Sequence, residues 1–211
     1  MIKLNKEELM KGVCLTLDNY ENISDVIEDI PHREFLDLYI TYNIFTGDSG
    51  VLRLCRLSKK DVKGICEDEE ELYQRALENT MRMFPPKIDS LDNVMNSLIG
   101  IFPEYGISPG EFVMTPYLYL GNVSGMYGSA VILYEELLRK IADMVHDDFY
   151  LLPSSIHEYL VVTDTAIHND IDWMIFMVRD VNRTCLDKEM VLSDNVYHYC
   201  HESNNLSVII R

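Results

Sequence analysis

A hydroxyl, an imidazole and a carboxylate fall together in the segment Pro153-Ser154-Ser155-Ile156-His157-Glu158. Nucleophilic catalysis uses these three types of side chain. If Ile156–Val162 is a strand, Ser155 and His157 share one face and Glu158 points to the other, because side chains alternate along a strand. The pattern therefore predicts a small hydrolase or transferase site at Ser155 and His157 in which Glu158 does not orient the imidazole. The simpler interpretation is that Ser154 and Ser155 satisfy backbone groups at a strand bend.

Two short runs combine imidazole and carboxylate, which are both common metal ligands: His146-Asp147-Asp148 and His168-Asn169-Asp170. Neither run has a third ligand at a diagnostic spacing. His146 beside acids at a helix end is more simply a favourable charge–dipole pair, and Asn169 or Asp170 is more simply a helix cap. We expect no metal site.

The segment Gly121–Gly128 is rich in glycine and invites comparison with a phosphate-binding loop. A P-loop needs Gly-Lys-Ser/Thr, and this segment contains no lysine, while its glycine spacing also fails the dinucleotide fingerprint. Glycines that supply a turn and a close strand crossing are the better explanation. We therefore expect no cofactor.

Tyrosine is frequent, with 13 copies against 1 tryptophan. Such rings anchor protein interfaces, although packing at the edge of the core is the simpler reason for them. The residues that we single out as candidates for binding are Tyr117, Tyr119, Tyr127, Ser154 and Glu158.

Charge and cysteine usage limit the classes of function. The net charge of −17 repels phosphate backbones and anionic lipid, so we expect neither direct nucleic-acid binding nor membrane binding. The acidity fits simple solubility, a basic protein partner, or mimicry of nucleic acid. The five cysteines are scattered without a C-x-x-C pair, and no apolar run approaches the ~20 residues of a membrane span. A cytoplasmic protein with reduced thiols is expected.

Periodicity and turn signals predict a mixture of helices and strands. The clearest helix is expected over Glu67–Met83, because acids fill its first turn and Pro85-Pro86 follows it. The other expected helices are Lys6–Gly12, Ser24–Asp29, Ser90–Gly100, Tyr134–Val145 and Asp170–Cys185. The expected strands are Val13–Leu17, Phe35–Phe45, Val51–Leu57, Tyr117–Leu120, Ser129–Leu133, Phe149–Leu152, Ile156–Val162, Val196–Tyr199 and Leu206–Ile210.

The order of these elements favours one fold class. No Pro/Gly/Ser-rich linker divides the 211 residues, no segment repeats, and strands do not alternate regularly with long helices. We predict a single α+β domain over residues 1–211, with one mixed, mostly antiparallel sheet and about four to five helices packed on it.

Several stretches in a fixed order resemble the bacterial domain of unknown function 5688 family. They are Asp29–Leu38 (DIPHREFLDL), Glu69–Thr80 (EEELYQRALENT), Tyr127–Ala130 (YGSA), Leu152–Glu158 (LPSSIHE) and Leu192–Tyr197 (LSDNVY). The resemblance spans about Leu4 to Tyr199 and implies a fold but no activity. The chain lacks the N-terminal region of many members, so it is a short member or a trimmed one.

The leading expectation is a non-enzymatic interaction module of the bacterial cytoplasm that has an acidic surface and a basic protein partner. The first alternative is the hydrolase or transferase at Ser155 and His157, which a serine-directed probe would label. The second is an acidic mimic of nucleic acid, which requires carboxylates on one continuous face.

Overall fold

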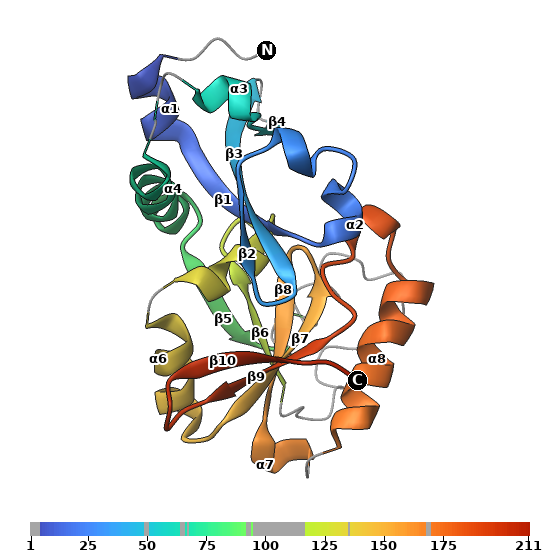
Figure 1. Ribbon diagram of the computed structural model, residues 1–211. Helices are drawn as coiled ribbons and strands as arrows, with labels where there is room; N and C mark the ends of the chain where they lie inside the picture. The colour runs from blue at the N-terminus through green and yellow to red at the C-terminus, as the bar shows by residue number, and fades with distance from the viewer. Residues whose placement is uncertain are drawn as a thin grey trace.

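The computed structural model describes residues 5–48, 51–63, 66, 68–91, 94, 117–134, 136–167 and 170–211. Its N-terminal part contains a four-stranded sheet (Figure 1). In this sheet β3 pairs with β1 along one edge and with β2 and β4 along the other, and every pairing is antiparallel. The strands are β1 (Val13–Asp18), β2 (His32–Phe35), β3 (Leu38–Asp48) and β4 (Val51–Arg56).

The C-terminal part contains a six-stranded sheet in the order β10-β9-β7-β8-β6-β5. Each of its pairings is also antiparallel. The strands are β5 (Pro86–Ser90), β6 (Tyr117–Asn122), β7 (Phe149–Ser155), β8 (Glu158–Thr163), β9 (Val196–Cys200) and β10 (Asn205–Ile209).

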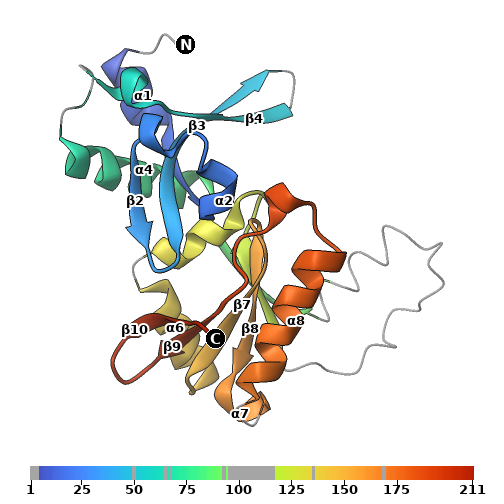
Figure 2. The same cartoon turned by 45° about the vertical axis from the view of Figure 1, so that its right-hand side comes forward.

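The long helices lie beside the two sheets. Figures 1 and 2 place α1 and α4 next to the N-terminal sheet and α8 along the C-terminal sheet. The helices are α1 (Lys6–Gly12), α2 (Tyr20–Ile23), η1 (Ile27–Asp29), α3 (Lys59–Val62), α4 (Glu69–Met83), η3 (Gly128–Leu133), α6 (Leu137–Val145), α7 (Asp164–Ile167), α8 (Ile171–Thr184) and η4 (Lys188–Met190). Within the described ranges, no helix is both long and apolar enough to cross a membrane.

The C-terminal sheet is buried on both faces, and β7 illustrates how. Phe149 and Leu151 point into a large apolar cluster, whereas Tyr150 and Leu152 point into a second cluster that α8 covers. Successive side chains of a strand point to opposite faces of the sheet, so alternate residues of β7 enter different clusters. Because both faces are buried, the sequence of β7 begins as a continuous apolar run. The large cluster also contains residues of β1 and β3, so one hydrophobic core joins the two sheets.

The predicted α+β class with mostly antiparallel strands is confirmed, and the structure adds that the strands form two sheets. The expected strand Ser129–Leu133 is wrong, since this segment belongs to the 3-10 helix η3. Most of η3 is buried, so its apolar run carries no alternation by which a strand and a helix could be told apart. The sequence also failed to predict β5, which follows the helix-ending Pro85 directly.

Two further expectations need correction at their boundaries. The single strand predicted over Phe35–Phe45 is two strands, joined by a turn at Leu36 and Asp37 in which Leu36 has a left-handed φ of 57°. The helix predicted over Ser90–Gly100 lies largely outside the described residues, and Ser90 itself ends β5.

Gly128 allows the start of η3 to pack against the turn between β7 and β8. A Cβ at this position would lie 2.2 Å from the main-chain oxygen of His157 and 2.9 Å from the main-chain nitrogen of Asn122. Both atoms belong to the backbone and cannot move aside cheaply. The close crossing that the glycine pattern predicted is therefore present here.

We expect Gly128→Ala to lower the free energy of unfolding by about 1–3 kcal/mol, because the added methyl group overpacks this crossing. Urea denaturation measures the loss. Gly12→Ala is the matched control, since its Cβ would meet nothing nearer than Ile44 Cγ2 at 3.8 Å. Equal effects of the two substitutions would contradict the close packing of η3 on the turn.

Cys14 is fully buried in β1, and its burial makes stability depend on pH. Burial raises the pKa of the thiol from 9.0 to about 12, although nearby Arg82 opposes the shift. Above pH 9 the unfolded thiol ionises while the folded one does not, so alkaline conditions favour unfolding.

We therefore expect the stability advantage of the wild type over Cys14→Ala to fall by about 2 kcal/mol between about pH 8 and about pH 10.5. Urea denaturation at the two pH values measures it. An unchanged advantage would mean that water reaches the thiol in the folded protein.

Candidate functional site

The segment that could carry nucleophilic chemistry forms a tight hairpin. Ser155 ends β7 and pairs with Glu158 at the start of β8, so Ile156 and His157 form the turn between them. The Ser155 hydroxyl donates to Glu158 Oε1 at 2.8 Å and accepts from the main-chain N–H of His157 at 3.0 Å. The expectation that Ile156 begins a strand and that Glu158 points away from Ser155 is therefore wrong.

The imidazole of His157 makes a different contact. Its Nδ1 accepts a hydrogen bond from the main-chain N–H of Tyr127 at 2.9 Å, and the two rings meet edge to face with centroids 5.7 Å apart. The hydroxyl of Ser155 thus contacts a carboxylate and a backbone N–H, while the imidazole holds the start of η3. This arrangement stabilises the turn, and the partner of the serine hydroxyl is the Glu158 carboxylate rather than the His157 imidazole.

The other candidate binding residues do not form one group. Tyr117 packs against the cluster beneath α8, and Ser154 lies at an irregularity in the β7–β8 pairing. Tyr119 is half-buried, which raises the pKa of its hydroxyl, and the nearby Glu158 carboxylate adds to the shift. Of the five candidates, Tyr127 lines a cavity of about 370 Å³.

The imidazole–carboxylate runs serve as structural supports. Asp147 accepts from both the main-chain N–H and the hydroxyl of Thr165 at the start of α7, which keeps the pKa of its carboxyl low. Asp170 caps α8 by accepting from the N–H of Trp173 at 3.0 Å, as the sequence predicted. His168 and Asn169 lie outside the described residues. Among the residues that the structure does describe, no group of three or more His, Cys, Asp and Glu could hold a metal ion.

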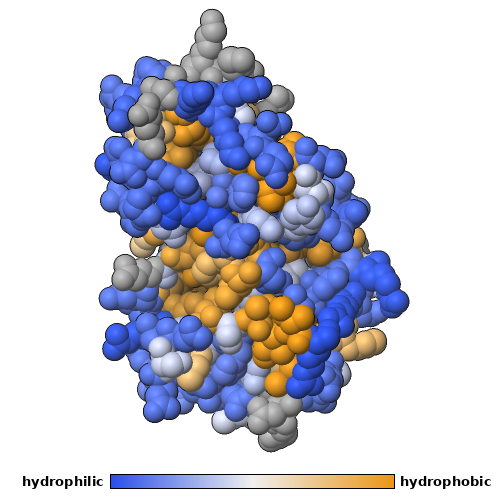
Figure 3. Space-filling view, in the orientation of Figure 1, coloured by the Kyte–Doolittle hydropathy of each residue, from blue (hydrophilic) through white to orange (hydrophobic). Residues whose placement is uncertain are grey.

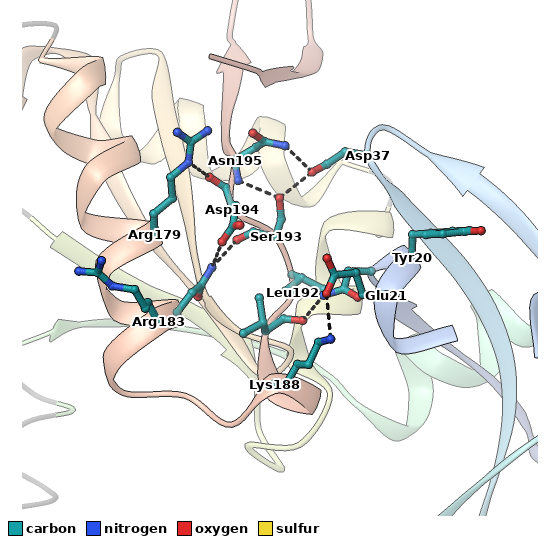
Figure 4. Close-up of a pocket in the computed structure, with 13 residues that line it drawn as sticks. Tyr20, Glu21, Asp37, Arg179, Arg183, Lys188, Leu192, Ser193, Asp194 and Asn195 are labelled. Carbon is teal, nitrogen blue, oxygen red and sulfur yellow. Dashed lines mark hydrogen bonds and ion pairs between the residues drawn. The ribbon is translucent and has the colours of Figure 1, made fainter. Parts of the chain in front are cut away.

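Two neighbouring cavities lie where the N-terminal and C-terminal parts meet. The Asp37 cavity is about 520 Å³ and is lined by Tyr20, Glu21, Asp37, Arg179, Lys188 and Ser193 among others (Figure 4). The Asp18 cavity is about 370 Å³ and is lined by Asp18, Glu21, Arg56, Tyr127, Lys188 and Glu189 among others. Glu21 and Lys188 line both cavities, and their side chains form an ion pair of 3.2 Å. We call the two cavities together the cleft.

Charged groups of both signs face the Asp37 cavity. Figure 4 shows Arg179 and Arg183 on one side of the pocket and Tyr20 and Glu21 on the opposite side. Lys188, on the short helix η4, reaches Glu21 across the base of this view. The cavity therefore has cationic groups from α8 and an anionic group from α2 on facing walls.

A polar network forms the wall of the Asp18 cavity. Asp18 pairs with Arg56 at 2.6 Å, and the side chains are only 13% and 27% exposed respectively. The second carboxylate oxygen accepts from the hydroxyl of Thr41 at 2.6 Å. Burial raises the pKa of the Tyr127 hydroxyl in this cavity, Asp18 raises it further and Arg56 opposes the shift. An ion pair this shielded holds its charges in place more firmly than a surface pair does.

Asp37 joins the two parts of the molecule. Its Oδ2 accepts from the hydroxyl of Ser193 at 2.6 Å and from Nδ2 of Asn195 at 3.0 Å, while its Oδ1 is buried without a hydrogen-bond partner. The buried hydroxyl of Tyr159 also has no hydrogen-bond partner. Burial raises the pKa of the Tyr159 and Tyr197 hydroxyls well above the ordinary value, and the Asp37 carboxylate adds to both shifts.

Sequence reasoning missed most of these residues. None of Asp18, Arg56 and Lys188 was among the candidate site residues predicted from the sequence. One signal was available for Asp37 and Ser193, because each lies in a stretch that carries the family resemblance. Two polar residues in separate resembling stretches are candidates for a mutual contact.

Comparison with known proteins agrees with that resemblance. The model of a family described as "Family of unknown function (DUF5688)" matches residues 3–201. The chain belongs to the DUF5688 family. No curated protein and no solved structure shows a significant match. Every residue that lines the cleft lies within the DUF5688 match, so the cleft is built from the part of the chain that defines the family.

We expect Asp37→Ala to lower the free energy of unfolding by about 1–3 kcal/mol, because the Ser193 hydroxyl and Asn195 Nδ2 then lose their acceptor. Tyr159→Phe should change stability by at most about 0.5 kcal/mol, or raise it, since the hydroxyl that it removes is buried and unpaired. Urea denaturation of both variants tests the contrast. A larger loss for Tyr159→Phe than for Asp37→Ala would contradict the assigned contacts.

Proposed function

We propose that this DUF5688 protein is a non-enzymatic interaction module of the bacterial cytoplasm that binds a basic segment of a partner protein in its cleft. The observation that carries the proposal is the set of carboxylates along the two adjoining cavities. Five acidic residues line them: Asp18, Glu21, Asp37, Glu189 and Asp194. The net charge of −17 would attract a basic partner over a longer range.

Glu21 is an exposed carboxylate of the cleft whose cationic partner can be exchanged. Its cationic partner is Lys188, and the two side chains are 71% and 74% exposed. Exposed pairs of this kind contribute only about 0–1 kcal/mol, so an incoming lysine or arginine can replace Lys188 at little cost. Because Lys188 stands between the two cavities, its displacement would also connect them.

Binding suits the cleft better than catalysis does. The polar groups around it are engaged with one another, as in the Asp18–Arg56 pair and the contacts of Asp37 with Ser193 and Asn195. For the alternative hydrolase, the hydroxyl of Ser155 contacts Glu158 and the main-chain N–H of His157, whereas the imidazole of His157 contacts Tyr127. For a mimic of nucleic acid, carboxylates should form one continuous face, whereas in the cleft they alternate with cationic side chains.

A labelled peptide tests the proposal directly. We expect a fluorescein-labelled peptide of lysine, arginine and glycine to bind, and the same peptide with glutamate in place of its basic residues not to bind in the cleft. Glu21→Gln should weaken binding of the basic peptide about tenfold, because it removes the exchangeable anion. Lys188→Met should strengthen it about threefold, because it removes the internal competitor. Fluorescence anisotropy at low and high salt measures each affinity.

Glu78→Gln is the matched control, because Glu78 on α4 is also exposed and also pairs with a single cation, Arg75, at 2.9 Å. It should leave the affinity unchanged. If Glu78→Gln and Glu21→Gln weaken binding equally, the peptide responds to net charge and the cleft is not the site. Absence of binding to the wild type at low salt contradicts the proposal outright.

A further inference from the structure

A second groove runs along α8 beside the carboxylate-lined cleft, and the two share Arg179 and Arg183. Residues that recur every three or four positions on this helix line it, together with Arg211 near the end of β10. They are Asp172, Ile175, Phe176, Arg179, Asp180, Arg183 and Arg211, and the cavity measures about 340 Å³. The spacing puts the helical members on one stripe of α8. We call this cavity the α8 groove.

Basic residues are concentrated at the α8 groove. Residues 117–211 contain six of them, and three line this one cavity. The six are Arg139, Lys140, Arg179, Arg183, Lys188 and Arg211. Two aspartates, Asp172 and Asp180, line the groove beside the three arginines, so the formal charge of the lining is 3 − 2 = +1 in a chain whose net charge is −17.

Arg179 is the cation that the groove leaves least compensated. Its Nε and Nη2 donate to the main-chain oxygens of Asp194, at 3.4 Å, and Arg211, at 2.7 Å. Within the described residues its guanidinium has no ion pair with an aspartate or glutamate side chain. The two bonds hold the guanidinium in place, so little side-chain entropy is lost when it binds an anion.

The other two arginines are in pairs that an anion can enter. Arg183 contacts Asp180 at 2.8 Å with side chains 78% and 42% exposed, and Arg211 contacts Asp172 in a pair that is also exposed. Exposed ion pairs contribute about 0–1 kcal/mol and exchange readily with an external carboxylate. The groove can therefore present up to three guanidinium groups.

Apolar side chains border the same groove. Phe176 lines it and is 63% exposed, and Trp173 and Met177, on the neighbouring positions of α8, are 40% and 36% exposed. Figure 3 shows that hydrophobic side chains also gather over β9 and β10, and Ile210 beside Arg211 is 70% exposed. Exposed apolar side chains beside arginines are typical of a protein-binding surface.

We infer that the α8 groove is a docking site for an acidic segment of a partner protein that also carries an apolar side chain. The carboxylates of the segment contact Arg179 and Arg183, and its apolar side chain packs on Phe176. A protein segment fits better than nucleic acid, because the net charge of −17 opposes a polyphosphate backbone and the groove is short. Arg179 and Arg183 also line the Asp37 cavity, so the groove and the cleft meet at these two arginines.

A fluorescein-labelled peptide of glutamate, leucine and phenylalanine tests the inference by anisotropy at low and high salt. We expect Arg179→Gln to weaken its binding about tenfold and Phe176→Ser about fivefold. Arg179→Lys keeps the positive charge but loses the planar guanidinium. Its affinity for the peptide should lie between that of the wild type and that of Arg179→Gln. Arg75→Gln is the matched control, because Arg75 on α4 is exposed and far from α8 in sequence, and it should bind like the wild type.

Thermal unfolding of every variant establishes that each one is folded before its affinity is compared. Three outcomes would overturn the inference. The first is that the acidic peptide does not bind the wild type, or that Arg179→Gln and Arg75→Gln lose affinity for it equally. The second is Arg179-dependent binding of a single-stranded oligonucleotide or of inorganic phosphate in preference to the peptide. The third is wild-type self-association in sedimentation velocity that Arg179→Gln abolishes, which would make a second copy of this chain the occupant.

Discussion

The contact of Asp37 with Ser193 and Asn195 is the interaction on which the shape of the cleft depends. Asp37 lies in the turn between β2 and β3, whereas Ser193 and Asn195 precede β9 in the other sheet. Nearby, Asn19 donates to the main-chain oxygen of Val191 at 2.8 Å. The segment from Lys188 to Asn195 is thus held at several points by the N-terminal part, and the two cavities form around it.

Polar burial at this junction comes at an energetic cost that the rest of the fold must offset. Thr16, Thr41 and Asn43 are fully buried, and several buried polar atoms, including Asp37 Oδ1 and the Tyr159 hydroxyl, have no hydrogen-bond partner. Each such atom costs about 1–3 kcal/mol. The shared hydrophobic core, which joins both sheets, supplies the compensating burial. Of these atoms, Asp37 Oδ1 belongs to a residue that lines the cleft.

Elements with strong local signals were predictable. The helix expected over Glu67–Met83 begins at Glu69, because Asp68 caps it by accepting from the N–H groups of Glu70 and Glu71. Asn5 and Asp170 cap their helices in the same way. Such signals are local, since a cap and its helix lie within one turn of each other. The prediction of a strand over Ser129–Leu133 was wrong, because a segment that is buried on every side shows no hydrophobic periodicity.

From its sequence alone this protein is a member of an α+β family with an acidic composition, capped helices and mostly antiparallel strands. Only the tertiary structure decided that the strands divide into two sheets and that arginines line a groove along α8. It also decided that the Ser155 hydroxyl donates its hydrogen bond to the Glu158 carboxylate rather than to the His157 imidazole. It also brought Asp37 to Ser193, 156 residues further along the chain. Caps, turns and periodicity act over a few residues, whereas the cleft and the α8 groove depend on contacts between distant segments that no local pattern specifies.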